Sequence, residues 1–139
     1  MSLTEEERRL LVEYRMEKAA ATFIEAQDNA CLNHWTLAAN RLYYAAYYAS
    51  SALLLNKGFA PKTHEGVNVM IHRELVKSGQ LTTEDGQLLS RLQVMRHSGD
   101  YDDLFEWKES DVQPYFLQTR AYIDKIKALI AGENHASEH

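Results

Sequence analysis

The sequence predicts an all-α fold, an up-and-down bundle of four to five antiparallel helices. Apolar residues recur at helical spacing in five segments, and residues that cap helices bound most of these segments. No segment has the pattern of a strand, and six glycines and two prolines in 139 residues leave room for long helices. This length suits one domain, which we expect at residues 1–132, followed by a polar, frayed tail at residues 133–139.

The first two helices are predicted from their ends. Thr4 and Glu7 form a capping box, so the first helix begins just after Thr4, and Asp28–Asn29 end it. The second helix runs over about residues 33–56, and Gly58 follows as the glycine that commonly terminates a helix. The apolar residues that share one face of the first helix are Leu10, Tyr14, Ala21 and Ile24.

The third and fourth helices are also predicted from capping residues. Thr63 is a suitable N-cap for the third helix, which ends at Ser78–Gly79. Thr82 or Thr83 starts the fourth helix, and Ser98–Gly99 stop it. The buried stripes of these helices are predicted to be Val67, Met70, Ile71 and Leu75, and Leu88, Leu92 and Met95.

The last helix begins after a polar loop. Ser110 and Gln113 suggest a capping box, and Pro114 is tolerated in the first turn because that turn has no amide partner to lose. Gly132 ends the helix. Its apolar stripe is Val112, Phe116, Ile123, Ile126 and Ile130. Short connections between amphipathic helices favour antiparallel neighbours, and hence the bundle.

Composition limits the classes of function. The net charge of −5 gives no general attraction to phosphate backbones, so a nucleic-acid role must rest on a small local site or on a basic partner. The single cysteine, Cys31, cannot form an intramolecular disulfide, which favours a reducing cytoplasmic setting. The acidic start of the chain does not read as a signal peptide, and the apolar stretch at residues 42–55 is too short to span a bilayer. We therefore expect a cytoplasmic protein with no membrane partner.

The usual catalytic and cofactor motifs are absent from the sequence. Of the six histidines only His135 and His139, in the polar tail, stand at His-x-x-x-His spacing, and no histidine has a cysteine partner at a zinc-site spacing, so we expect no metal. The glycines form neither a phosphate-binding loop nor a dinucleotide fingerprint, so we expect no cofactor.

The second helix contains an unusual group of polar and aromatic residues. Arg41, Tyr44 and Tyr48 stand at i, i+3 and i+7 and share one face. The tyrosines are better explained as core residues whose hydroxyls find hydrogen bonds. Arg41 is harder to explain as packing, because a guanidinium amid Ala, Leu and Tyr needs a carboxylate or an anionic ligand.

The end of the fourth helix is the second group of interest. Its residues are Arg96, His97, Ser98, Gly99, Asp100 and Tyr101. One interpretation is structural: Arg96 suits the negative end of the helix dipole, Gly99 supplies a left-handed cap, and Asp100 pairs with Arg96. The other interpretation is a binding site, and composition and spacing leave both open.

These segments resemble the HEPN domains (higher eukaryotes and prokaryotes nucleotide-binding), and in particular their small stand-alone prokaryotic branch of uncharacterised proteins. The matching stretches run in the family's order from residue 35 to residue 103. They are Ala39–Ala45 leading to Ala52–Leu54, Lys62–Val67, Leu88–Arg96 and Gly99–Asp103. The resemblance implies a helical bundle, usually a homodimer, often associated with a minimal nucleotidyltransferase. It also implies a link to metal-independent ribonucleases that act as toxins or defence effectors.

The family's active motif is an arginine, four residues and a histidine, often with a tyrosine two places further on. Arg96 occupies the arginine position, followed by His97 at a polar position, but Tyr101 stands at the histidine position and Asp103 at the tyrosine position. A phenol with a pKa of about 10 is a poorer base than an imidazole with a pKa of about 6.5. The resemblance therefore makes Arg96 and Tyr101 the catalytic candidates. The ligand-binding candidates are Arg41, Tyr44, Arg96, His97, Asp100 and Tyr101.

Three functions follow as alternatives. The first is a HEPN-like module that binds a nucleotide, RNA or a nucleotidyltransferase partner near the end of the fourth helix, within a toxin–antitoxin or defence system. The second is an active metal-independent ribonuclease toxin. The third is a dimeric interaction domain without a ligand.

Overall fold

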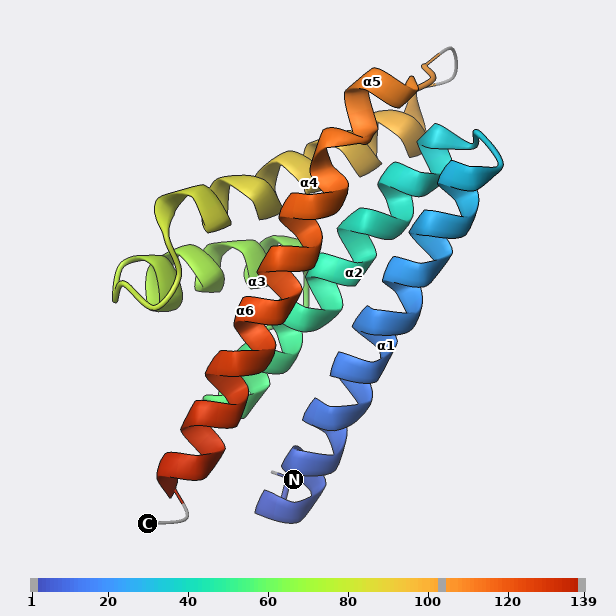
Figure 1. The fold of residues 1–139 in the computed structure, drawn as a ribbon. Helices are drawn as coiled ribbons and strands as arrows, with labels where there is room; N and C mark the ends of the chain where they lie inside the picture. Colours follow the sequence, from blue (N-terminus) through green and yellow to red (C-terminus); the bar gives the residue numbers. More distant parts are fainter. Residues whose placement is uncertain (1–2, 103–104, 138–139) are drawn as a thin grey trace.

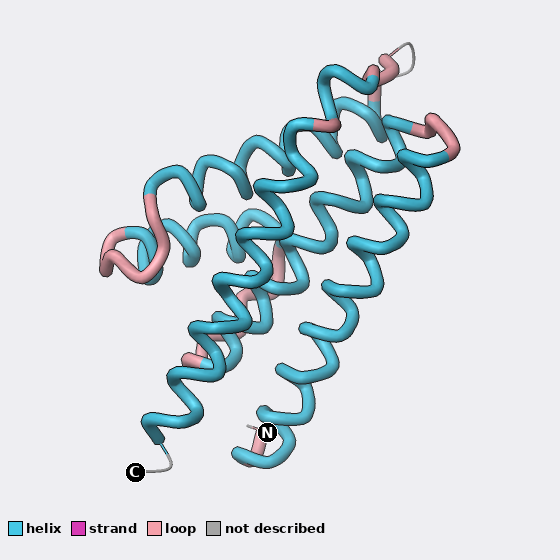
Figure 2. The backbone as a smooth tube through the Cα atoms, viewed as in Figure 1, coloured by secondary structure: helices cyan, strands magenta, loops and turns pink. Residues whose placement is uncertain are grey.

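The computed structural model describes residues 3–102 and 105–137, and in this part of the chain it contains helices and no strand (Figures 1 and 2). The all-α prediction is therefore confirmed. The elements are α1 (Glu5–Cys31), α2 (Trp35–Asn56), α3 (His64–Met70), the π-helix η1 (Ile71–Val76), α4 (Thr83–Tyr101), α5 (Glu109–Val112) and α6 (Pro114–Ser137).

The predicted caps are present at three helix starts. The Thr4 and Thr82 side chains each accept a hydrogen bond from the third amide of their helix, and Glu7 and Asp85 complete two capping boxes. Thr63 accepts from the Gly66 amide at 2.9 Å. Because these caps satisfy amides that have no partner inside the helix, they fix where α1, α3 and α4 begin.

The central helix is α2, which contacts α1, α3, α4, α5 and α6. In Figure 1, α1 runs antiparallel to α2, whereas α6 runs in the same direction as α2. An ion pair of 2.7 Å between Lys57 and Glu133 joins the ends of α2 and α6. The α3–η1 segment and α4 form a second group that packs on α2 at an angle to these helices (Figure 1).

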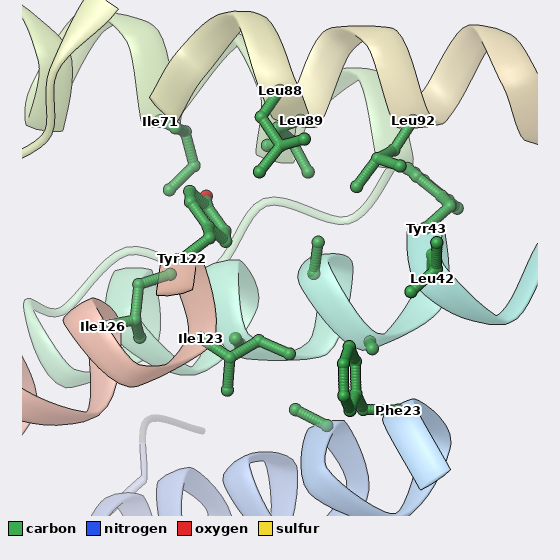
Figure 3. Close-up of a cluster of buried hydrophobic side chains, with 14 of the residues drawn as sticks. Phe23, Leu42, Tyr43, Ile71, Leu88, Leu89, Leu92, Tyr122, Ile123 and Ile126 are labelled. Atoms are coloured by element: carbon green, nitrogen blue, oxygen red, sulfur yellow. The ribbon is translucent and has the colours of Figure 1, made fainter. Parts of the chain in front are cut away.

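The core lies where α1, α6, the α3–η1 segment and α4 pack on α2 (Figure 3). The predicted stripes of the third, fourth and last helices are largely buried, with Met70 and Phe116 only half-buried. Tyr122 is buried among them, and its hydroxyl lies 2.6 Å from Ser50 Oγ. Small buried residues of α2, six of them alanines, allow the neighbouring helices to approach closely.

The predicted apolar face of α1 is wrong. Leu10, Tyr14 and Ile24 are each more than half exposed, and Ala21 is exposed as well. The buried residues of α1 are Val12, Ala19, Thr22, Phe23 and Ala26. Two fully buried alanines in this set let the backbone of α1 lie close to α2. The face of α1 that is buried is therefore the one with small side chains, not the one with the largest apolar side chains. The helix also continues to Cys31, past the predicted stop.

The predicted stop of the fourth helix at Ser98–Gly99 is also wrong. α4 continues through Gly99 to Tyr101, and Gly99 does not have a positive φ. A Cβ at Gly99 would lie 2.8 Å from Thr36 Cγ2 at the start of α2. Gly99 therefore serves close packing of α4 on α2 rather than a helix cap, and the added turn carries Asp100 and Tyr101.

The third helix is not a single α-helix, because it changes to a π-helix at Ile71. This segment packs closely on α4, because a Cβ at Gly86 of α4 would be 2.8 Å from His72 Nε2. A π turn is wider than an α turn, and here both Ile71 and Leu75 are fully buried.

The last helix differs from the prediction at both ends. Lys108 N donates to Asp111 Oδ2 at 3.1 Å, so the short α5 starts earlier than a cap at Ser110 would place it. α6 then begins at Pro114 and continues past Gly132 to Ser137. Contacts of Glu133 with α2 hold part of the segment that was expected to be a frayed tail. No helix in the described ranges is both long and apolar enough to cross a membrane.

Candidate functional site

Four tyrosines of α2 form the aromatic part of the candidate site. We call Tyr43, Tyr44, Tyr47 and Tyr48 the tyrosine cluster. Tyr43 is fully buried, and the other three are half-buried. Neighbouring rings lie 5.2–6.3 Å apart between centroids, in edge and tilted arrangements that suit aromatic pairs. Burial raises the pKa of Tyr43 and Tyr47, so both phenols stay protonated at neutral pH.

Arg96 reaches this cluster from α4. Its guanidinium carbon lies 5.5 Å from the Tyr43 ring centre and 5.4 Å from the Tyr44 ring centre, and Nη2 donates to the Tyr44 hydroxyl at 3.1 Å. Its side chain is only 15% exposed. The buried Nε has no hydrogen-bond partner in the described part of the chain. A nearly buried guanidinium with an unused donor is costly, unless a ligand supplies the acceptor.

Asp100 is the carboxylate nearest to Arg96, but it is held elsewhere. The shortest ion-pair distance, from Arg96 Nε to Asp100 Oδ2, is 3.8 Å, which is too long for a hydrogen bond. Asn40 Nδ2 lies closer, at 3.2 Å and 2.9 Å from the two carboxylate oxygens. The predicted pairing of Asp100 with Arg96 is thus present only as a long ion pair.

Arg41 also packs against Tyr44. Its guanidinium lies 5.1 Å from the Tyr44 ring centre. Nε and Nη2 donate to Asn40 Oδ1 at 2.9 Å and 2.7 Å, and Nη1 lies 3.5 Å from Glu25 Oε1. The carboxylate expected for Arg41 is therefore Glu25 of α1, and an amide oxygen takes most of the hydrogen bonds.

Tyr101 and His97 lie at the outer edge of the site. Tyr101 is 63% exposed, and its ring centre lies 5.8 Å from the Arg96 guanidinium carbon. His97 is exposed, and its ring lies 4.8 Å from that of Tyr101. The structure thus brings Arg41, Tyr44, Arg96, Asp100 and Tyr101 together, with His97 further out. Asp103, the residue at the family's tyrosine position, lies outside the described residues.

His64 is a site residue that the sequence analysis missed. It is the first residue of α3, and its ring stacks on Tyr47 with centroids 4.3 Å apart. Nδ1 lies 2.9 Å from the Tyr43 hydroxyl. Burial, together with the positive charge of Arg96, lowers the pKa of His64. The available signal was the Thr63 cap, which fixes the position of His64, together with the matching stretch Lys62–Val67.

Metal ligands are not grouped in the described residues, where no set of three or more His, Cys, Asp or Glu side chains is placed to hold an ion. The chemical groups gathered here are the guanidiniums of Arg41 and Arg96, the imidazole of His64, with that of His97 further out, and several phenols. As residue types, guanidinium groups bind anions, imidazoles and phenols exchange protons, and aromatic rings stack on planar groups.

Comparison with known proteins identifies relatives over most of the chain. The family model of the HEPN domain matches residues 12–129. A "UPF0332 protein" of Thermotoga maritima is 34% identical over 124 residues, which cover 89% of this chain and 94% of the relative. Two proteins of Methanocaldococcus jannaschii named "Putative toxin" are each 29% identical. The first match covers 88% of this chain and 84% of the relative, and the second covers 63% and 64%.

Proposed function

Because the chain belongs to the HEPN domain family, we propose that it is a toxin-type HEPN protein that binds RNA or a nucleotide by its phosphate at Arg96. The observation that carries this proposal is a guanidinium that is only 15% exposed, has no carboxylate within hydrogen-bond distance in the described residues, and donates there only through Nη2, to the Tyr44 hydroxyl. Arginine is well suited to phosphate, because its planar fork of donors matches the phosphate oxygens.

The residues around Arg96 support a phosphate ligand. Asn40 holds the Asp100 carboxylate, so the negative charge nearest to Arg96 does not occupy its donors. Tyr101 presents an exposed ring at the edge of the site, on which a base can stack. With a net charge of −5, the protein offers a local phosphate site rather than a broad basic surface.

The binding experiment compares two arginines of α4. Arg96→Gln removes the proposed phosphate ligand, whereas Arg91→Gln removes an exposed arginine of the same helix that donates only to the Tyr115 hydroxyl, at 3.3 Å. Fluorescence anisotropy with a labelled single-stranded RNA, and calorimetry with AMP and ATP, measure the affinity. A charged hydrogen bond is worth about 1.5–3 kcal/mol, so Arg96→Gln should weaken binding about ten- to hundredfold.

The control Arg91→Gln should leave the affinity within about threefold of wild type, because an exposed charge away from the ligand changes binding little. Equal loss in both variants would show only a general effect of charge. Absence of binding by wild type to RNA and to both nucleotides at millimolar concentration would contradict the proposal and leave an interaction domain without a ligand.

We also propose that the protein is a cytoplasmic homodimer, with a small nucleotidyltransferase as a further partner. Leu37, Val94 and Tyr101 are each more than half exposed, and they come from α2 and α4, which carry the site. Light scattering should give twice the chain mass of 16.0 kDa at micromolar concentration. A monomer mass across that range would contradict the dimer.

Co-purification with the product of a neighbouring nucleotidyltransferase gene tests the other proposed partner.

A second candidate function is metal-independent cleavage of RNA. It is favoured by the two relatives whose names include the word toxin, and by the imidazole of His64 beside the same tyrosines as Arg96. Wild-type protein should cleave RNA in the presence of EDTA, and Arg96→Gln should not. Cleavage that is unchanged by Arg96→Gln, or that EDTA abolishes, would contradict this candidate.

A further inference from the structure

His64 and Arg96 approach the tyrosine cluster from two different helices. His64 comes from the start of α3, and its ring centre lies 5.7 Å from those of both Tyr43 and Tyr44. Arg96 comes from α4, and its guanidinium carbon lies 5.5 Å and 5.4 Å from the same two rings. The imidazole and the guanidinium thus pack on the same two rings, and the charge of Arg96 acts on His64, although 31 residues of chain separate them.

The hydrogen bonds of His64 leave one ring nitrogen for a ligand. Nδ1 is engaged with the Tyr43 hydroxyl, and stacking on Tyr47 fixes the plane of the ring. No group of the described chain hydrogen-bonds to Nε2. A neutral imidazole whose other nitrogen is held in this way is the usual arrangement of a histidine that exchanges protons with a substrate.

The other histidine near Arg96 is less well placed. His97 is exposed and packs against the ring of Tyr101 rather than against the tyrosine cluster. Tyr101 itself carries a phenol, which is a weak base at neutral pH. The site thus holds one well-positioned imidazole, and it comes from α3.

We propose that His64 is the proton-transfer residue of this site, and that it acts on the ribose 2′-hydroxyl of an RNA whose phosphate is bound by Arg96. This inference rests on the proposed RNA cleavage. In the tautomer whose Nδ1–H donates to the Tyr43 hydroxyl, Nε2 takes the proton of the 2′-hydroxyl, a bond forms between O2′ and phosphorus, and the bond from phosphorus to O5′ breaks. The leaving O5′ takes a proton from water, and His64 returns its proton to the solvent. The products are a 2′,3′-cyclic phosphate and a free 5′-hydroxyl.

Arg96 has a separate part in this reaction. Its guanidinium would bind the non-bridging phosphate oxygens and stabilise the charge that develops on them. The two residues should therefore fail in different ways when replaced. Loss of Arg96 should weaken RNA binding as well as cleavage, whereas loss of His64 should slow cleavage and leave binding nearly unchanged.

The experiment replaces His64 by Asn, which keeps a polar partner for the Tyr43 hydroxyl, and uses His34→Asn as the control. His34 is exposed at the start of α2 and makes no capping hydrogen bond there. Cleavage is followed with a fluorophore–quencher RNA in EDTA, and binding with an RNA that carries a 2′-deoxy residue at the cleavage site. A general base contributes about 10²–10⁴-fold, so His64→Asn should lower the rate at least about a hundredfold. His34→Asn should leave it unchanged.

The pH profile gives a measurement that a purely structural role would not move. The wild-type rate should fall as pH drops below neutral, because the protonated imidazole cannot accept a proton, and His64→Asn should lack this acidic limb. The titratable and charged groups around His64 are Tyr43, Tyr44 and Tyr47 of α2, which contact its ring, and Arg96 of α4, whose charge acts on it. Glu65, the next residue of α3, acts on Tyr43.

The outcomes separate this inference from the proposals on which it rests. Cleavage that is equally fast in His64→Asn overturns the role of His64 but leaves the ribonuclease proposal standing. A loss of cleavage that merely follows a loss of RNA binding also overturns it. If wild type binds RNA and does not cleave it, the ribonuclease and this role fall together, while binding at Arg96 stands. Should His64→Asn not fold, a wild-type rate that shows no acidic limb overturns the proposal by itself.

Discussion

Replacement of Gly99 by alanine tests the close contact that lets α4 continue to Tyr101. In an open helix the change should stabilise the protein by about 0.5–1 kcal/mol, because alanine loses less backbone entropy than glycine. Here the new Cβ would lie 2.8 Å from Thr36 Cγ2. Thr36 is not free to rotate away, because its Oγ1 accepts a hydrogen bond from the Trp107 amide at 2.9 Å.

The contact therefore decides the sign of the change. Overpacking of a tight contact costs about 1–3 kcal/mol, which exceeds the gain in helix propensity. The net destabilisation of Gly99→Ala should be about 1–2 kcal/mol, or a fall in melting temperature of roughly 3–8 °C for a domain of this size. RNA affinity should fall as well, because the displaced turn carries Tyr101, the ring on which we propose that a base stacks.

A second substitution isolates the clash. Thr36→Ser removes the Cγ2 methyl but keeps the hydroxyl that accepts from Trp107, so the double variant should recover at least about 1 kcal/mol of the loss. Thermal and urea denaturation of the four proteins complete a double-mutant cycle. A Gly99→Ala protein that is more stable than wild type would refute the reasoning, because Gly99 would then behave as an ordinary exposed helix residue.

Two further predictions concern buried polar contacts. Ser50→Ala should lower the free energy of unfolding by about 1–3 kcal/mol, because it leaves the buried Tyr122 hydroxyl without its partner. Tyr122→Phe should cost less, because Ser50 Oγ still donates to the Ala46 carbonyl at 2.7 Å. Equal losses of stability in urea denaturation would contradict this. Burial by itself would raise the pKa of Asp85, but hydrogen bonds from Lys125 and from the Thr82 cap bring it below its usual value. Because the folded pKa is the lower one, this stability is complete above the unfolded pKa of about 3.9 and is lost as pH falls through the folded pKa. The stability curve of Asp85→Asn should therefore be flatter than that of wild type below pH 4, and parallel curves would count against the pair.

The sequence analysis succeeded where the cause of a structure is local. Thr4, Thr63 and Thr82 were predicted as caps because a cap depends on residues within three positions of it. Gly99 was misread as a cap because its real reason, the contact with Thr36, lies 63 residues away in the sequence. The apolar face predicted for α1, which includes Leu10, Tyr14 and Ile24, is wrong because the face that is buried depends on the contacts of α1 with α2, which the sequence of α1 alone does not show.

The candidate site was predicted in part. Arg96, Asp100 and Tyr101 came from the resemblance to a family, and Tyr44 and Arg41 came from their spacing on one helix. Their contacts agree with a common site, while their roles remain predictions. His64 was missed because its partners belong to another helix, and a single histidine at a helix start has no spacing pattern that would reveal it.

The position of Asn40 has a consequence for the charge of the site. The amide accepts from Arg41 and donates to Asp100, so it links an arginine to a carboxylate on another helix. With Glu25 beside Arg41 and Asp100 near Arg96, the row contains two positive and two negative side chains. The free protein is thus electrically balanced along this row. A phosphate bound at Arg96 would add negative charge beside Asp100, and the hydrogen bonds from Asn40 reduce that repulsion without removing it, so Asp100→Asn should tighten the binding of a phosphate ligand.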